Sequence, residues 1–139
     1  MLRYTVENMK EGKFATVITC MDGRVQEPVS TWMKKHLKVD FIDTITEPGP
    51  DRFVTQGDEQ QLESLNKKLD ISIKLHRSSN VAVVAHDDCG GNPVSKEEHL
   101  KQLAGAVDLL TSWKLPVRIM GLWVDESWQV QLMHDKPRK

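Results

Sequence analysis

Three residues whose side chains bind soft metal ions stand at the ends of two apolar segments. Cys20 directly follows the β-branched run 14–19, and His86 and Cys89 follow a second such run at 81–85. Apolar runs that end in small and polar residues predict buried strands. Because ligands bind at the carboxyl edge of the strands in open α/β sheets, we expect the two segments to share a site. Two thiolates and one imidazole suit Zn²⁺ and leave a fourth position free.

A carboxylate and a guanidinium accompany the first cysteine. Asp22 stands two residues after Cys20, close enough to compete for the fourth position, and Arg24 could hold that carboxylate in a bidentate pair away from the metal. If the fourth ligand is water, zinc lowers its pKa toward neutrality and makes a hydroxide nucleophile. Asp22 could then accept a hydrogen bond from the hydroxide. Alone, Cys-x-Asp-x-Arg is a weak pattern, but beside a strand-terminal His-x-x-Cys it becomes specific.

Apolar periodicity predicts how the chain positions these residues. Strands are expected at 14–19, 39–45, 81–85 and 117–124, with a fifth at the sheet edge over 129–133. Helices are expected at 6–10, at 28–38 with its start at Glu27-Pro28, from 58 to about 76, and from a Ser95–Glu98 capping box to Trp113. This alternation predicts an α/β fold, with a mostly parallel four- to five-stranded sheet flanked by helices.

The segment Thr46–Asp51 places two prolines around a glycine, which predicts an extended, turning loop. It leaves the carboxyl end of a predicted strand, so we expect it near the two motifs. Two interpretations stay open: the loop shapes a pocket, or it is a rigid connection.

The other four histidines lie outside the two motifs and are expected on the surface. His99 stands at the start of a predicted helix, where it is a candidate proton shuttle. The four are His36, His76, His99 and His134.

Composition limits the class of protein. The 139 residues are expected to form a single domain, 1–139, and the net charge of −1 comes from 19 basic and 20 acidic residues without a long block of one sign. This pattern argues against nucleic acid or an anionic membrane as a partner. No apolar run approaches the roughly 20 residues of a membrane span. The first five residues lack the apolar core of a signal peptide, so we expect a cytoplasmic protein whose cysteines are metal ligands or reactive thiols rather than a disulfide.

The two motifs together resemble the signatures of the β-class carbonic anhydrases, Cys-x-Asp-x-Arg and His-x-x-Cys-Gly. They stand here at Cys20, Asp22, Arg24, His86, Cys89 and Gly90. In topology the resemblance spans about residues 11–133. It implies zinc on Cys20, His86 and Cys89, an Asp22–Arg24 dyad, and reversible hydration of CO₂ to bicarbonate. It also implies a homodimer or higher homo-oligomer.

The sequence departs from that family where substrate is bound. Glu11 falls where the family typically has a glutamine, and Thr46–Pro50 replaces an Arg-Asn-Ala-Gly-Asn-like segment. An aromatic cluster equivalent to the family's hydrophobic CO₂ wall is not evident. The pattern therefore predicts a conserved type of metal site beside an altered substrate site.

Three other functions are compatible with these residues. The chain could bind zinc without carbonic anhydrase activity, with Asp22 permanently on the metal. It could act on another small electrophile such as CS₂ or COS. A thiol-based sulfurtransferase or phosphatase is a further alternative, because Cys20–Arg24 superficially resembles their anion-binding loops. That alternative leaves His86 and Cys89 without a role.

Overall fold

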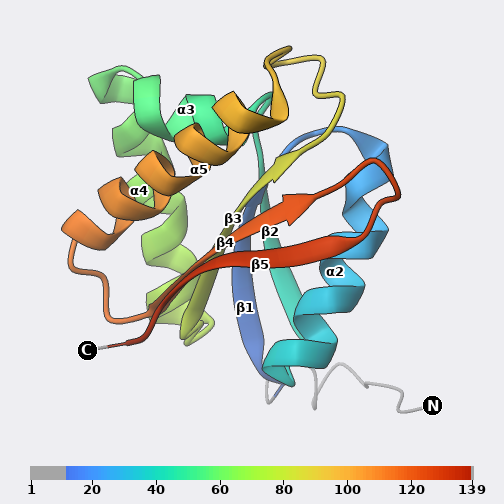
Figure 1. Cartoon of the computed structure of the whole chain (residues 1–139). Coiled ribbons are helices and arrows are strands. Elements are labelled where there is room, and N and C mark those ends of the chain that lie inside the picture. The colour runs from blue at the N-terminus through green and yellow to red at the C-terminus, as the bar shows by residue number, and fades with distance from the viewer. Residues whose placement is uncertain (1–11, 139) are drawn as a thin grey trace.

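The computed structural model of the protein describes residues 12–138. Its elements are β1 (Phe14–Thr19), α2 (Gly23–Leu37), β2 (Phe41–Thr46), α3 (Pro50–Gln56), α4 (Glu59–Leu75), β3 (Asn80–His86), α5 (Lys96–Ser112), β4 (Arg118–Val124) and β5 (Val130–Lys136). The strands form one sheet in the order β2-β1-β3-β4-β5 (Figure 1). The first four are parallel and β5 is antiparallel to β4. The predicted fold class is confirmed.

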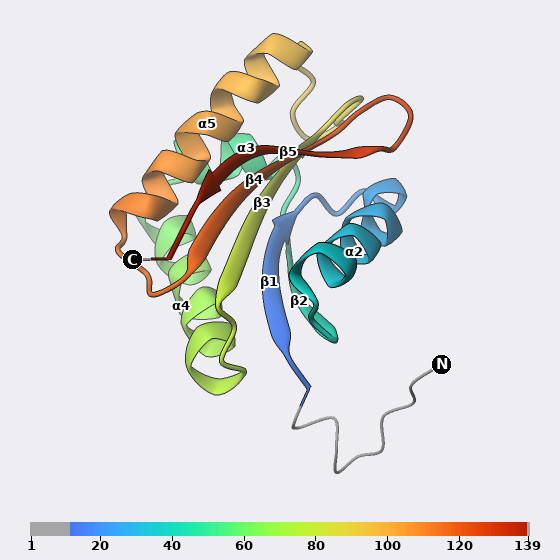
Figure 2. The same cartoon turned by 60° about the horizontal axis from the view of Figure 1, so that its bottom comes forward.

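Helices cover both faces of the sheet, as Figure 2 shows. Helix α2 packs on one face, where Val29 and Met33 join one buried cluster. Helices α3, α4 and α5 cover the other, where Leu69 and Leu110 belong to the second cluster. Because both faces are buried, the central strands read as nearly continuous apolar runs. No helix among residues 12–138 is long and apolar enough to cross a bilayer.

The connections reverse direction between two neighbouring strands. The chain leaves β1 through α2 on one face to reach β2, and it leaves β3 through α5 on the opposite face to reach β4. Since β1 and β3 are adjacent and parallel, their carboxyl ends border the crevice that such a reversal creates. The fold therefore brings the residues that follow β1 and β3 to one place.

The predicted start of the first crossover helix is wrong. Helix α2 begins at Gly23 rather than near Pro28, because the Asp22 side chain caps it by accepting the Arg24 backbone N–H at 2.9 Å. Pro28 consequently lies inside the helix, one and a half turns from its start. The cap places Asp22 and Arg24 at the sheet edge.

The second strand and the loop after it are shifted relative to the prediction. Strand β2 runs from Phe41 to Thr46 instead of 39–45. The predicted loop is shorter at its far end, since α3 begins at Pro50, a residue whose fixed φ suits the first helical position. Gly49 precedes it with a φ of 62°, in the left-handed region that glycine adopts without strain.

The remaining elements lie close to their predicted positions. Helix α4 is preceded by a capping box between Asp58 and Gln61, and α5 begins at Ser95, whose hydroxyl accepts the Glu98 N–H. Strand β5 is longer than the predicted 129–133, and Arg118 binds Asp135 with two hydrogen bonds of 2.8 Å across β4 and β5. The helix predicted at 6–10 lies outside the described residues.

We expect Leu69→Ala to lower the free energy of unfolding by about 2–5 kcal/mol, because Leu69 is fully buried between α4 and the sheet. The matched control is Leu75→Ala in the same helix. Leu75 is 74% exposed, and its truncation should change stability by no more than about 0.5 kcal/mol. Urea denaturation of the two variants measures the difference. Equal effects would contradict the packing of α4 described above.

Candidate metal centre

The two cysteines and His86 meet at the crevice between β1 and β3. Cys20 is the first residue after β1, His86 is the last residue of β3, and Cys89 lies three residues beyond it. One potential ligand atom from each lies within 4.8 Å of the others, and all three residues are buried. The two sulfurs are 3.9 Å apart, and neither cysteine forms a disulfide. The structure thus brings together the three residues that the sequence analysis selected.

The imidazole is oriented with one nitrogen toward this group. His86 Nδ1 donates a hydrogen bond to the Asp87 carbonyl at 2.7 Å. That bond sets the tautomer and leaves Nε2 with a free lone pair. Nε2 is buried and has no protein partner among the described residues. A buried polar atom without a partner is costly, so its position requires an explanation such as a bound cation.

The two thiols do not ionise independently. The Cys89 side chain hydrogen-bonds the Cys20 sulfur and, with nearby backbone N–H groups, lowers the pKa of Cys20 despite its burial. The resulting Cys20 thiolate, together with burial, raises the pKa of Cys89. The two pKa values shift in opposite directions, so one thiol of the pair loses its proton more readily than the other. A second thiolate 3.9 Å from the first needs a positive charge beside it.

The pair of sulfurs and the imidazole nitrogen fit a tetrahedral zinc ion. Two thiolates bound to zinc at about 2.3 Å with tetrahedral angles lie about 3.8 Å apart, and the observed separation is 3.9 Å. A divalent cation would also balance both thiolate charges and use the lone pair of His86 Nε2.

Arg24 holds Asp22 beside this group. The guanidinium donates from Nε and Nη2 to the Asp22 carboxylate, with the shortest contact at 2.7 Å. These hydrogen bonds lower the pKa of Asp22 to about 2, so the carboxylate is ionised at neutral pH. Asp22 is not part of the group of three converging ligand atoms. The predicted bidentate pair is therefore present in the described structure.

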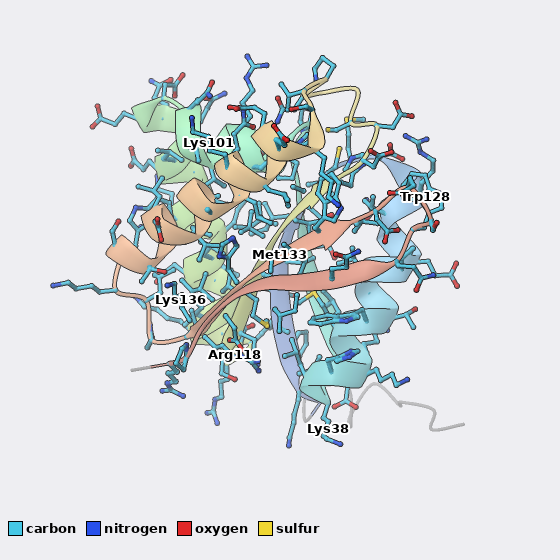
Figure 3. The ribbon with its side chains drawn as sticks, viewed as in Figure 1. Lys38, Lys101, Arg118, Trp128, Met133 and Lys136 are labelled. Atoms are coloured by element: carbon cyan, nitrogen blue, oxygen red, sulfur yellow. The ribbon has the colours of Figure 1, made fainter. Side chains whose placement is uncertain are left out.

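Two further residues hold the same guanidinium, and the sequence analysis assigned neither of them to it. Asp88 accepts from Arg24 through its side chain and its backbone carbonyl, both at 3.2 Å. The Arg24 guanidinium carbon also lies 4.7 Å from the ring centroid of Trp128, within the range of a cation–π contact. Figure 3 shows Trp128 at the turn between β4 and β5. Arg24 thus joins the loops that follow β1 and β3.

The loop after β2 lies against the second motif, as predicted. A side chain at Gly91 would clash with Pro48, since an added Cβ would lie 2.6 Å from the Pro48 Cβ. Glu11, the other position at which the sequence departs from the β-class pattern, lies outside the described residues.

One of the surface predictions for the histidines is wrong. His99 is fully buried and its Nδ1 lies 2.7 Å from an oxygen of Asp51, also buried, so the side chain is not in contact with solvent as a proton shuttle would require. Asn92 and Gln102 are buried with them. No metal-binding pattern pointed to these residues, because their pairing joins positions far apart in the chain. His36 and His76 are exposed and His134 is half-buried.

Comparisons with known proteins agree with this geometry. Among solved structures, a carbonic anhydrase from Glaciozyma antarctica aligns with a TM-score of 0.59 at 17% identity, over 85% of this chain and 80% of its own. One of two tetrameric β-carbonic anhydrases from Sordaria macrospora aligns with a TM-score of 0.57 at 10% identity, over 91% and 84%. The β-carbonic anhydrase CafA of Aspergillus fumigatus gives 0.51 at 15% identity, over 92% and 79%. At these identities the likeness shows the fold.

The sequence itself carries the family assignment. A search of curated proteins finds no match to the chain. A family model described as "Putative carbonic anhydrase" matches residues 10–134, which is most of the chain. The protein therefore belongs to this carbonic anhydrase family.

Proposed function

We propose that this protein is a zinc enzyme that catalyses the reversible hydration of CO₂ to bicarbonate, with Cys20, His86 and Cys89 as the zinc ligands. The observation that carries the proposal is the convergence of two sulfurs and an unpartnered imidazole nitrogen at the crevice between β1 and β3. Membership of the carbonic anhydrase family and the fold of the solved carbonic anhydrases support it.

The three buried ligands would hold zinc, and bound zinc supplies a Lewis acid that lowers the pKa of water toward neutrality. The thiolates balance the charge of the cation, and the Asp87 carbonyl keeps the His86 ring in the tautomer that presents Nε2. This arrangement leaves one tetrahedral position for water or substrate.

Asp22 and Arg24 would control what enters that position. The Asp22 carboxylate is held on Arg24 and stays ionised, so one of its oxygens can accept a hydrogen bond from the water or hydroxide and orient its lone pair toward CO₂. Arg24 is a positioning residue in this scheme. It binds Asp22 bidentately and so keeps the carboxylate from taking the fourth zinc position itself.

We further propose that the protein works as a homodimer or higher homo-oligomer. The solved structure from Sordaria macrospora is described as tetrameric and shares this fold. Light scattering coupled to size-exclusion chromatography measures the mass of the particle. The cytoplasmic location stays a prediction.

A zinc protein without carbonic anhydrase activity is the second candidate. It is favoured by one observation, the loop Thr46–Pro50, which brings Pro48 and Gly49 rather than polar side chains against Gly91. Another small electrophile, CS₂ or COS, is the substrate to test if CO₂ hydration is absent.

We expect the purified protein to bind about one zinc ion per chain and His86→Gln to abolish stoichiometric binding, because the amide cannot replace the imidazole lone pair. Cys89→Ser should have the same effect. Metal analysis after dialysis measures the zinc content, and zinc should raise the melting temperature of the original protein but not that of the two ligand variants. His36→Gln, which changes an exposed histidine of α2, is the matched control and should retain zinc. A Cys89→Ser variant with full zinc content would refute the ligand assignment.

We expect the zinc-loaded protein to accelerate CO₂ hydration and Arg24→Ala to lower kcat/KM by about 10- to 100-fold, as loss of a residue that orients a metal-site group does. The reason is that Asp22 loses its bidentate partner. Stopped-flow measurement with a pH indicator gives the rates. Arg52→Ala, at an exposed position of α3, is the control and should keep the original rate. A zinc-loaded protein with no rate above that of buffer would exclude the enzyme and leave the second candidate.

A further inference from the structure

Four buried polar side chains lie behind the loops that follow β2 and β3, and the proposed reaction assigns none of them a role. Each is at most 8% exposed, and one carries a carboxylate; they are Asp51, Asn92, His99 and Gln102. A buried carboxylate or amide lowers stability unless its hydrogen bonds are made inside the protein. The hydrogen bonds of these four side chains therefore indicate which segments they hold in place.

Donors surround the carboxylate. His99 Nδ1 lies 2.7 Å from Asp51 Oδ2, and Asn92 Nδ2 lies 3.2 Å from Asp51 Oδ1. Asn92 Nδ2 also donates to Gln102 Oε1 at 2.7 Å, so both amide protons of Asn92 are used. His99 Nε2 is buried and has no protein partner among the described residues. A neutral ring with its proton on Nδ1 fits, because a charged ring would bury an unpaired N–H.

These residues come from three segments of the chain. Asp51 is in the first turn of α3, two residues after Gly49. Asn92 lies three residues after Cys89, and its backbone N–H donates to the Cys89 carbonyl at 3.2 Å. His99 and Gln102 lie one turn apart on α5, which is the rigid element of the three. The network therefore fastens two loops to one helix.

The two loops cross without room for a side chain. A Cβ at Gly49 would lie 2.6 Å from the Asn92 Cβ and 3.1 Å from the Gly91 carbonyl oxygen. Real Cβ atoms do not approach other atoms at 2.6 Å, so the crossing requires glycine at this position. The Asp51–Asn92 hydrogen bond lies directly behind the crossing and holds the loops together.

Each loop directs backbone N–H groups at a sulfur. The backbone N–H groups of Gly49 and Asp22 help to lower the pKa of Cys20. Those of Gly91 and Asn92 act in the same direction on the pKa of Cys89, and the Asn92 N–H also donates to the Cys89 carbonyl at 3.2 Å. Such hydrogen bonds withdraw electron density from a thiolate, and groups that surround metal ligands in this way tune the metal. A shift of either loop would move these donors.

We propose that Asp51 and Asn92, held by His99 and Gln102, are positioning residues for the two thiolates. They lock the loops after β2 and β3 against each other, and they thereby fix the N–H groups that set how much electron density each sulfur donates to a metal. The inference rests on the proposed metal site and adds a part of the chain that supports it.

The experiment loads the protein with Co²⁺ and measures the sulfur-to-cobalt charge-transfer band and the Co²⁺ affinity by chelator competition. Asn92→Asp places a second carboxylate against Asp51 and removes both amide donors. We expect its band to move to lower energy, because sulfurs with fewer N–H contacts are more electron-rich, and its affinity to fall by about 10- to 100-fold. Gln102→Met removes the acceptor of Asn92 and the 3.3 Å hydrogen bond to Glu98 but leaves the Asp51–Asn92 pair intact. It should give a smaller shift in the same direction and serves if Asn92→Asp does not fold.

The double variant Asp51→Asn with Asn92→Asp tests the pairing itself. It exchanges donor and acceptor, keeps one negative charge, and allows Gln102 to donate with its amide reversed. We expect it to return the band and the affinity toward those of the original protein. Leu69→Ala is the control for lost stability, since it acts on α4 and should leave the band unchanged.

Two results would overturn the proposal. One is an Asn92→Asp protein whose band and affinity equal those of the original protein. The other is a band shift in Leu69→Ala as large as that in Asn92→Asp. Failure of the metal site itself has a different signature, because the original protein would then bind neither Co²⁺ nor Zn²⁺.

Discussion

Two thiols whose sulfurs lie 3.9 Å apart in a buried crevice form the constraint on which the site depends. The hydrogen bond to Cys20 and burial raise the pKa of Cys89, so a second ionised sulfur beside the first is disfavoured. A divalent ion removes that conflict and uses the His86 lone pair as well. The folding free energy holds these groups together against their mutual repulsion and loss of solvation, and metal binding would add to that free energy.

The order of the strands in the sheet brings these groups to one place. Because β1 and β3 are neighbours whose crossovers lie on opposite faces, their carboxyl ends diverge and leave space for Cys20 and His86. The central strands β1, β3 and β4 are buried on both faces, so their ends have little freedom to move. The loops are held separately, by a helix cap at Asp22 and by the network around Asp51.

The sequence predicted those parts of the structure that depend on local pattern. The runs 14–19 and 81–85 are rich in apolar and β-branched residues, and both became central strands with at most one residue added at each end. The three converging residues could be found because each follows such a run. The start of α2 was mispredicted because Pro28 resembles a first-turn proline, whereas the Asp22 side chain caps the helix five residues earlier.

Burial of polar side chains could not be predicted in the same way. His99 lies in the first turn of an amphipathic helix, four residues before Leu103 and eight before Val107, so helical spacing places it on the buried face. The polar ring gave the opposite indication, and its partner is not local. Its partner Asp51 is 48 positions away, in a segment that the prolines and glycine mark only as a loop. The pairing exists because α3 packs on α5, a contact that depends on the whole sheet. Trp128 is a similar case, since only the β4–β5 turn brings it over Arg24.

The contacts of Arg24 bear on how the fourth metal position could be controlled. The guanidinium is bound by Asp22 on one side and by the Asp88 carboxylate and carbonyl on the other, with Trp128 against it. If Asp22 turned toward the metal, Arg24 would keep a carboxylate partner and its position. If Asp22 left Arg24, the guanidinium would still be paired with Asp88. The free-energy difference between Asp22 on Arg24 and Asp22 on a metal ion would therefore be smaller than the loss of the bidentate pair alone would give. Asp88 thus links the loop that carries Cys89 to the state of Asp22.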